Sequence, residues 1–225
     1  MKRLLCVTVA LTLLWLPVSL AEAVDAPNWY EVFVRSYQDS DGDGLGDLNG
    51  LRSRLDYIRD MGWGGLWLMP VMPSPSYHKY DVTDYMAVDA EYGTADDARA
   101  LVDQAHARGI AVIFDLPVNH TSTRHPWFEA AAEAIRAGKD SPYTEYYHFR
   151  REPGPGYVQL DGTGWYYEEQ FAGGGMPDIN LDSEAVRREL AAILSFYLNG
   201  VASKLGIQRS EKRGEGFAPP DRIVP

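Results

Sequence analysis

Three short apolar segments, each followed by a segment with helical periodicity, set the pattern of hydrophobic and polar positions along this chain. The first lies within residues 31–36, the second within 65–69 and the third within 110–114. The third is a continuous apolar run, which predicts a strand covered on both faces, as in a parallel sheet. The strands begin roughly 35 to 45 residues apart, a spacing typical of strand–helix units. The pattern therefore predicts an α/β fold with a parallel sheet.

Apolar residues at helical spacing predict a helix after each of these strands. The first helix carries Leu48, Leu51, Leu55, Ile58 and Met61. The second begins with a capping box, Thr94-x-x-Asp97, and ends near Gly109, a candidate C-cap. Its buried residues are expected to be Ala98, Leu101, Val102 and Ala105.

The segment 121–180 interrupts this pattern, because it is rich in proline, glycine and tyrosine. Such a segment is too long for an ordinary connecting loop and predicts a long excursion or a small subdomain. Four of its aromatic residues can form platforms for sugar rings or a small core, namely Trp165, Tyr166, Tyr167 and Phe171. We expect two of the four to lie in the core.

A last helix follows this segment, with Asp182 or Ser183 as its N-cap and Gly200 at its end. One face of this helix carries Val186, Leu190, Ile193, Leu194, Tyr197 and Leu198. No strand is predicted after it.

The first 23 residues have the features of a secretory signal peptide, namely a basic start, an apolar stretch and a small-x-small cleavage site at Ala21-Glu22-Ala23. A membrane anchor is the alternative, but Pro17 interrupts the apolar run, which is short for a span. We therefore expect a secreted or periplasmic protein. Cys6 is the only cysteine and lies inside this segment, so the processed chain would form no disulfide.

The chain is acidic, with a formal net charge of −11 and a calculated pI near 4.8. This charge argues against nucleic acid or an anionic membrane as a partner. It permits a neutral substrate and bound cations.

Acidic residues alternate at the start of the loop 39–47, where Asp39, Asp41 and Asp43 are separated by single residues, and Asp47 closes the loop. Alternating carboxylates with intervening glycines can converge on one hard cation, so we predict a Ca²⁺ site, with the Leu45 carbonyl as a further ligand. The loop begins like an EF-hand, but glycine occupies the position where that motif has its bidentate glutamate. A solvated acidic turn is the alternative.

Polar residues crowd the positions after the second and third predicted strands. Asp115 and His120 follow the third strand, and His78 and Tyr80 follow the second. The carboxyl ends of neighbouring parallel strands meet at one edge of a sheet, where α/β enzymes keep their chemistry. These side chains can hydrogen-bond and stack on a sugar, although each taken singly is as consistent with a structural role.

Taken together and in order, these motifs resemble glycoside hydrolase family 13, the α-amylase and α-glucosidase family. The matching segments are Tyr30-Glu-Val-Phe-Val-Arg35, the 39–47 loop, Tyr77-His78-Lys-Tyr80-Asp81, Asp115-x-x-x-Asn119-His120 and Met176-Pro-Asp-Ile-Asn180. The resemblance extends from about residue 28 to Val201 and implies a (β/α)8 TIM barrel with a subdomain inserted after strand three. On that basis residues 24–120 form the first part of the barrel, 121–180 the inserted subdomain and 181–201 barrel helix three.

The resemblance also implies an activity and a set of site residues. The activity is retaining cleavage of α-glucosidic bonds in an α-glucan or malto-oligosaccharide. Tyr80 would stack on the sugar, and His78, Asp115 and His120 would hydrogen-bond it. The calcium loop is similar to that of oligo-1,6-glucosidases. Two further residues, Asn119 and Asp178, match positions that hold a second calcium in many α-amylases.

The sequence departs from this family after Val201. The family's next strand carries an Arg-x-Asp motif with the nucleophile, and later strands carry the acid/base glutamate, but residues 202–225 contain no Arg-x-Asp. This segment is locally basic and proline-containing and is expected to be disordered, as after a frameshift or truncation. We therefore predict an enzyme of this family without catalytic residues and without activity as this chain. The alternative is a non-catalytic carbohydrate- or calcium-binding protein.

Overall fold

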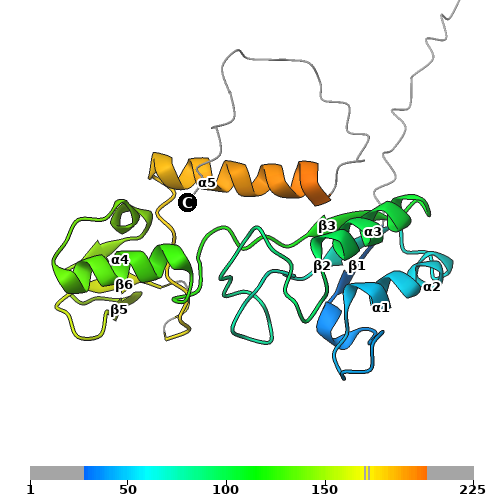
Figure 1. Cartoon of the computed structure of the whole chain (residues 1–225), viewed down its shortest axis with the longest axis horizontal. Coiled ribbons are helices and arrows are strands. Elements are labelled where there is room, and N and C mark those ends of the chain that lie inside the picture. Colours follow the sequence, from blue (N-terminus) through cyan, green and yellow to red (C-terminus); the bar gives the residue numbers. More distant parts are fainter. Residues whose placement is uncertain (1–27, 170, 172, 202–225) are drawn as a thin grey trace, which may run out of the picture.

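The computed structural model describes residues 28–169, 171 and 173–201, so the predicted signal peptide and the 202–225 segment lie outside the described residues. A three-stranded parallel sheet forms one end of the molecule, with strand order β1-β2-β3 (Figure 1). The strands are β1 (Trp29–Val32), β2 (Gly65–Leu68) and β3 (Ala111–Phe114). Each strand pairs in register with the next, Val32 with Leu68 and Leu68 with Phe114.

The first strand ends earlier than its apolar pattern predicts. β1 stops at Val32, and residues Val34–Ser36 form a 3-10 turn, η1. Backbone hydrogen bonds from Ser36 to Phe33 and from Tyr37 to Val34 close this turn. A strand over 31–36 is therefore wrong in its bounds, because the chain bends at Phe33 to enter the acidic loop.

Helices α1 (Leu48–Ser53), α2 (Leu55–Asp60) and α3 (Ala95–His106) pack against the sheet. The predicted first helix is thus two short helices that are separated at Arg54. The predicted capping box of α3 is confirmed, since Thr94 accepts from the Asp97 amide and Asp97 accepts from the Thr94 amide. All four residues expected to be buried on α3 are buried.

One face of the sheet is buried and the other is open. The face under the helices carries Val32, Leu66 and Leu68, which have almost no exposed surface. On the opposite face, Trp67 is 40% exposed and its register partner Ile113 is 41% exposed. The expectation of a third strand covered on both faces is therefore wrong for the residues that the structure describes.

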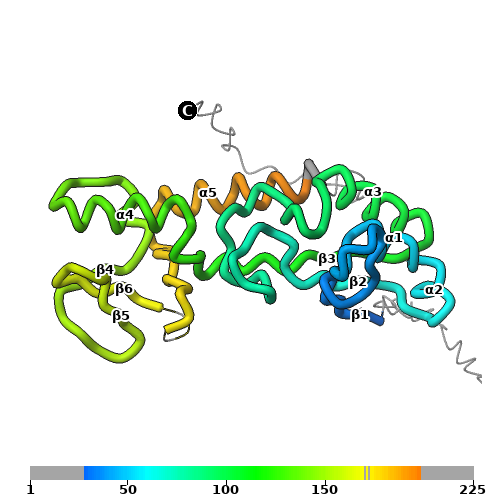
Figure 2. The backbone as a smooth tube through the Cα atoms, turned by 60° about the horizontal axis from the view of Figure 1, so that its bottom comes forward, coloured from blue at the N-terminus to red at the C-terminus, as the bar shows by residue number. Residues whose placement is uncertain are grey.

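Residues 121–180 form a second compact unit, which Figure 2 shows at the opposite end of the molecule. It consists of α4 (Pro126–Ala137), the 3-10 helix η2 (Pro142–Tyr146) and a small antiparallel sheet of strand order β4-β6-β5. These strands are β4 (Phe149–Arg150), β5 (Tyr157–Gln159) and β6 (Tyr166–Glu168). The sequence pattern indicated a subdomain but not helix α4.

Helix α5 (Glu184–Ser195) and the π-helical turn η3 (Phe196–Val201) run lengthwise between the two units (Figure 1). Ser183 is its N-cap, as expected. Val186 packs into the core of the inserted unit, and Ile193 and Tyr197 pack into the core beside the sheet. Leu194 and Leu198 were expected on the same buried face, but they are 46% and 57% exposed.

No helix among the residues described is long and apolar enough to cross a membrane.

Candidate active-site pocket and comparison with known proteins

A pocket of about 560 Å³ lies at the carboxyl ends of β2 and β3. The four side chains predicted to contact a sugar all line this pocket, namely those of His78, Tyr80, Asp115 and His120. Asn119 lines it as well. Parallel strands bring these residues together, because Asp115 follows β3 and its amide bonds the Leu68 carbonyl of β2 at 2.8 Å. The sequence did not indicate the apolar wall of the pocket, which Leu116, Pro117 and Met176 form with Phe171.

Tyr80 and Asp115 form a direct pair inside this pocket. The Tyr80 hydroxyl donates to Asp115 Oδ2 at 2.9 Å. Burial, followed by this hydrogen bond, raises the pKa of Tyr80 to about 12, so the phenol keeps its proton at neutral pH. The other carboxylate oxygen of Asp115 is not part of this hydrogen bond and is the kind of acceptor that a sugar hydroxyl requires.

Hydrogen bonds to its own loop fix the orientation of His78. Its Nδ1 accepts from the Tyr80 amide at 3.1 Å and lies 3.1 Å from Ser76 Oγ. Because Nδ1 is an acceptor, the neutral ring carries its proton on Nε2. The loop is closed by Asp81, which accepts from the hydroxyls of Ser74 and Ser76.

His120 is buried at the pocket wall and is uncharged at neutral pH. Its Nε2 lies 3.2 Å from the Tyr80 carbonyl, and burial lowers its pKa. With Nε2 donating to that carbonyl, Nδ1 is an acceptor, and this buried atom has no hydrogen-bond partner among the residues that the structure describes. Phe171 stands edge-on to this imidazole, with ring centroids 6.1 Å apart, and is 54% exposed.

The four aromatic residues of the inserted unit divide differently from the expectation of two in the core. Only Tyr167 is buried, and it packs edge-on against Phe128. Trp165 and Tyr166 are partly buried, and the Arg151 guanidinium lies 4.1 Å from the centroid of the Trp165 ring.

Lys79 lies between the two pocket residues His78 and Tyr80, and sequence reasoning assigned it no role. It is 2% exposed, and its backbone is in the left-handed region with φ 65°. Its ammonium donates to Asp89 at 2.7 Å and to Glu91 at 2.8 Å. The lysine thus ties the pocket loop to the segment before α3. Its position inside the Tyr-His-Lys-Tyr-Asp motif was the only signal in the sequence.

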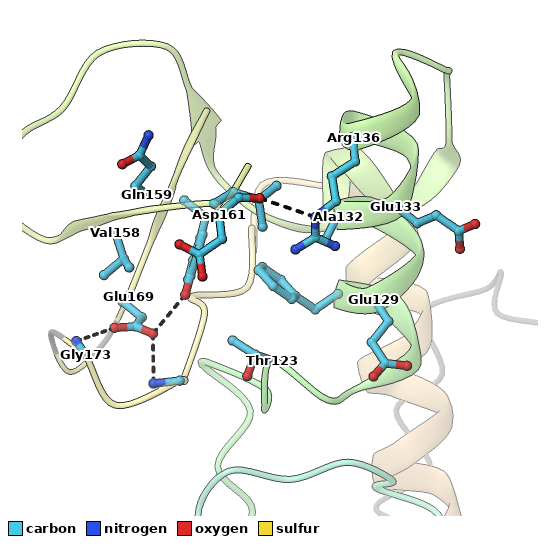
Figure 3. A pocket seen from close by; sticks show the side chains of 14 residues that line it. Thr123, Glu129, Ala132, Glu133, Arg136, Val158, Gln159, Asp161, Glu169 and Gly173 are labelled. Carbon is cyan, nitrogen blue, oxygen red and sulfur yellow. Dashed lines mark hydrogen bonds between the residues drawn. The ribbon is translucent and has the colours of Figure 1, made fainter. Parts of the chain in front are cut away.

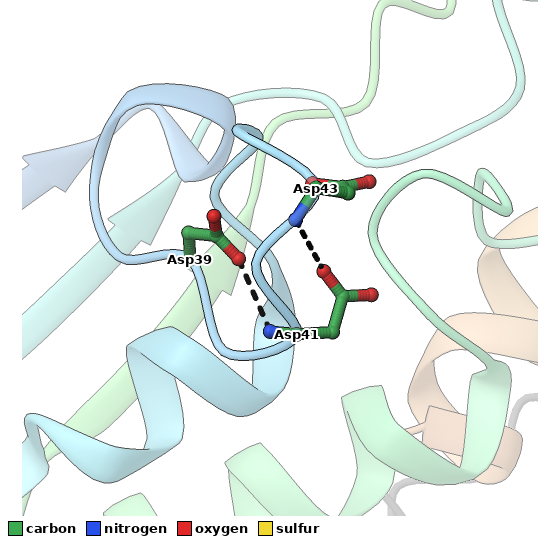
Figure 4. A group of neighbouring side chains, drawn as sticks. All are labelled: Asp39, Asp41 and Asp43. Atoms are coloured by element: carbon green, nitrogen blue, oxygen red, sulfur yellow. Dashed lines mark hydrogen bonds between the residues drawn. The ribbon is translucent and has the colours of Figure 1, made fainter.

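The acidic loop brings three carboxylates together. Oxygen atoms of Asp39, Asp41 and Asp43 all lie within 4.8 Å of one another (Figure 4). Amides of Gly42 and Gly44 donate to Asp39 and hold its pKa below its usual range. Both glycines have a positive φ, which residues with a side chain rarely adopt, so the bend in this loop depends on glycine. Three hard oxygen donors at this separation fit a calcium-sized cation.

Asp47 has a different environment from these three carboxylates. It is the N-cap of α1 and accepts from the Gly50 amide and from both the amide and the hydroxyl of Ser40. Those donors fix the carboxylate at the base of the loop. Ligation by Asp47 and by the Leu45 carbonyl stays a prediction.

The two residues expected at a second calcium site lie on adjoining segments. His120 and Asp178 form an isolated antiparallel bridge, and the Ile179 amide donates to the Asn119 carbonyl at 2.9 Å. Burial, with a contribution from Glu168, raises the pKa of Asp178. The structure thus brings both segments together, and the second metal stays a prediction.

A larger pocket, of about 790 Å³, lies in the inserted unit and contains none of the predicted site residues (Figure 3). Its buried carboxylate, Glu169, is already engaged by the amides of Gly173 and Gly175 and by the Tyr167 hydroxyl. Its remaining acidic groups, such as Glu129 and Glu133, are exposed on α4. The smaller pocket at the strand ends is the better candidate site, because polar side chains that follow two neighbouring strands converge in it.

Residues 31–204 match the family model described as "Alpha amylase, catalytic domain". The chain belongs to the alpha-amylase family. Among its curated relatives, Alpha-amylase 3 of Dictyoglomus thermophilum is 46% identical over 173 residues, which cover 76% of this chain and 34% of that protein. Oligo-1,6-glucosidase of Heyndrickxia coagulans is 36% identical over 185 residues, covering 76% and 32%.

Solved structures of the alpha-amylase family have the same fold. Eubacterium rectale Amy13B is 56% identical, with a TM-score of 0.75, over 78% of this chain and 35% of that one. The alpha-amylase from H.orenii is 43% identical, with a TM-score of 0.68. This chain therefore spans about a third of the length of the relatives it matches. Its described residues form the amino-terminal part of a (β/α)8 barrel fold, and the barrel is not closed within them.

Proposed function

We propose that this chain supplies the amino-terminal half of the α-glucan site of a glycoside hydrolase that acts on α-glucosidic bonds. The observation that carries the proposal is the convergence of His78, Tyr80, Asp115 and His120 on one pocket at the strand ends. The names of the relatives, an alpha-amylase and an oligo-1,6-glucosidase, support the same substrate class.

The pocket residues have the chemistry to bind and orient a glucosyl unit. Tyr80 and Phe171 offer aromatic surface, and Asp115 offers carboxylate oxygens as hydrogen-bond acceptors. His120 lines the same pocket. Retaining cleavage additionally requires a nucleophile and a general acid about 5 to 5.5 Å apart. We infer that a 225-residue polypeptide of this sequence binds malto-oligosaccharides without cleaving them, because the family's Arg-x-Asp motif does not occur after Val201.

We also propose that the loop 39–47 binds Ca²⁺. Asp39, Asp41 and Asp43 would hold the ion, with Asp47 and the Leu45 carbonyl as further ligands. The ion would relieve the repulsion among these carboxylates and stiffen the connection from β1 to α1. Calorimetric titration of chelator-treated protein is expected to show Ca²⁺ binding, and the loss of this binding in Asp41→Asn/Asp43→Asn checks the assignment. No heat of binding at millimolar Ca²⁺ would contradict it.

The proposed location of the protein outside the cytoplasm depends on residues 1–23. Export followed by cleavage after Ala23 is expected. Amino-terminal sequencing of the protein recovered from the periplasm or the medium would establish it, and an uncleaved cytoplasmic product would contradict it.

Titration with maltotriose tests the sugar site. The wild-type chain is expected to bind with a dissociation constant on the order of a millimolar, as suits half of a site. Asp115→Asn removes the charged acceptor, and the loss of a charge-assisted hydrogen bond should weaken binding by about tenfold or more. Glu133→Gln, in the larger pocket, is the matched control and is expected to bind as the wild type does.

Two outcomes would contradict the proposal. Equal affinities of wild type and Asp115→Asn would exclude this pocket as the sugar site. Steady release of p-nitrophenol from p-nitrophenyl α-glucoside by the purified chain would contradict the inference that it binds without cleaving. A non-catalytic carbohydrate-binding protein is the second candidate function, and the convergence of His78, Tyr80 and Asp115 on one pocket favours it for this chain by itself.

A further inference from the structure

A third cavity, of about 340 Å³, lies where helix α5 passes the start of α4 and the loop after β2. It shares no lining residue with the sugar pocket or with the larger pocket of the inserted unit. Its volume is near the lower end of the range of about 300 to 1,000 Å³ that small-molecule sites occupy. The cavity is therefore large enough for a small ligand, and the groups that line it decide which kind.

Aromatic side chains form one wall of this cavity. Tyr85 and His125 are buried, with ring centroids 5.7 Å apart, and Trp127 packs on His125 with a centroid distance of 4.5 Å. The Tyr85 hydroxyl donates to the Pro117 carbonyl at 2.9 Å, and the His125 ring accepts from the Trp127 amide, so the rings are fixed in place. The faces of tryptophan and tyrosine rings attract a cation that lies within about 6 Å of the ring centroid.

Two carboxylates line the cavity beside this wall. Asp84 accepts from the Met86 amide at 2.8 Å, and Glu189 lies on α5. Neither carboxylate forms an ion pair with another residue that the structure describes, and Arg188, the neighbour of Glu189 in the chain, pairs with Glu184 at 2.7 Å instead. Both negative charges are therefore available to a ligand.

The electrostatics of the cavity favour a positively charged ligand. Burial, followed by the charge of Glu189, raises the pKa of Tyr146 to about 12, and burial, followed by the charge of Asp84, raises the pKa of Tyr197. Burial also lowers the pKa of His125 to about 4, so the imidazole in the wall is uncharged at neutral pH. The start of α4 contributes only about half a positive charge, which the two carboxylates outweigh.

The remaining lining distinguishes between kinds of cation. A hard divalent ion binds about six to eight oxygen ligands. Here Met86, Pro126 and Ile193 add carbon and sulfur surface to the aromatic wall instead. A lining of this kind suits a ligand that combines a positive charge with an apolar body.

We propose that the cavity between α4, α5 and the loop after β2 binds a small organic cation, an ammonium group on a short apolar body. The rings of Tyr85 and Trp127 and the carboxylates of Asp84 and Glu189 hold the charge. This site goes beyond the proposed function and does not rest on it, because it uses no residue of the sugar pocket.

Choline and its uncharged isostere 3,3-dimethylbutan-1-ol form a matched pair of probes for this site. Saturation-transfer NMR follows the methyl protons of each probe in the presence of the wild-type chain, at neutral pH and constant ionic strength. Choline is expected to bind with a dissociation constant on the order of a millimolar, and the isostere at least about fivefold more weakly, because it lacks the charge. Equal binding of the two probes would overturn the proposal.

Uncharged variants of nearly equal shape locate the binding. Glu189→Gln and Asp84→Asn are each expected to weaken choline binding by about threefold or more, and the double variant is expected to show none. Glu133→Gln removes the same charge from α4 outside this cavity and is the control, which is expected to bind choline as the wild type does. Circular dichroism melting establishes that each variant folds like the wild type. Choline binding by the double variant with wild-type affinity would overturn the assignment.

Maltotriose separates this site from the sugar pocket. Asp115→Asn is expected to leave choline binding unchanged, and an excess of maltotriose is expected not to displace choline. Displacement of choline by maltotriose would locate choline in the sugar pocket and overturn the proposal. Choline binding that depends on Glu189, in a chain that does not bind maltotriose, would leave this site standing and defeat the proposed function.

Discussion

At the scale of single residues, the geometry of the pocket depends partly on side chains that do not line it. Lys79 has a left-handed backbone conformation between His78 and Tyr80, and its ammonium forms ion pairs with Asp89 and Glu91. A buried ammonium with a buried carboxylate partner makes each dependent on the other, because a lone charge in the interior is costly. The loop that carries His78 and Tyr80 is therefore held in place by ion pairs that lie outside the pocket.

Replacing Lys79 by methionine tests this dependence. Lys79→Met keeps most of the side-chain volume but leaves Asp89 without its cation, and we expect a loss of about 3 to 5 kcal/mol in the free energy of unfolding by urea. Arg35→Met is the control, because Arg35 pairs with Glu91 at a partly exposed site, where such a pair contributes under about 1 kcal/mol. Equal losses in the two variants would show that the buried pair has no special role.

His125 makes the stability of the chain depend on pH. Burial lowers the pKa of this imidazole from 6.5 to about 4, because the folded protein disfavours its charged form. The corresponding stability is fully present above pH 6.5 and is lost as the pH falls from 6.5 toward 4, by about 3 kcal/mol in total. Its Nδ1 also accepts from the Trp127 amide as the N-cap of α4.

Asparagine at position 125 separates these two roles. Asn retains an N-cap acceptor but does not titrate. In urea titrations between pH 7 and pH 4, His125→Asn is expected to show a smaller loss of stability than the wild type. Parallel pH profiles for the two proteins would contradict the assignment to His125.

At the scale of elements, the sequence predicted best those features that a few neighbouring residues determine. The capping box fixes the start of α3, and its four-residue buried stripe follows from helical spacing. The same kind of periodicity failed at the end of α5, where Leu194 and Leu198 are exposed although they continue the apolar face. Periodicity reports which face a complete fold would bury, and the described residues do not supply the neighbour for that face.

The capping box supports a prediction with a clear control. Thr94→Ala removes the acceptor for the Asp97 amide and is expected to lower the free energy of unfolding by about 1 kcal/mol. Thr94→Ser keeps the hydroxyl, and serine is at least as good an N-cap as threonine, so the free energy of unfolding should change little. A chemical-denaturation series measures both, and equal losses would mean that the cap does not hold the helix.

The sequence did not predict the division into helices α1 and α2 or the early end of β1, and the reason is a different one. The apolar residues from Leu48 to Met61 keep one helical period, so nothing in that pattern marks the break at Arg54. In the same way, Val32 and Val34 are both buried, and only the tertiary turn at Phe33 ends the strand between them. Helix α4 was missed because prolines and glycines around it indicated irregular structure.

At the scale of the whole molecule, one helix joins two small cores. Val186 near the start of α5 packs with Phe128 and Tyr147, while Tyr197 near its end packs with the core beside the sheet. The pocket lies where the sheet meets the inserted unit, since Phe171 and Met176 from that unit line it together with Asp115 and His120 from the segment after β3. The sequence predicted the polar half of this pocket through strand-end positions, but its apolar half depends on how the inserted unit folds back.

The central claim is that the pocket at the strand ends, and not the larger pocket of the inserted unit, takes the sugar. Hydrogen–deuterium exchange of the chain with and without saturating maltotriose measures this directly. If the sugar binds at the strand ends, backbone amides in residues 76–81 and 115–120 exchange more slowly with maltotriose, and those around Val158 to Glu169 change little. Protection confined to the segments that line the larger pocket, with none at 76–81 and 115–120, would contradict it.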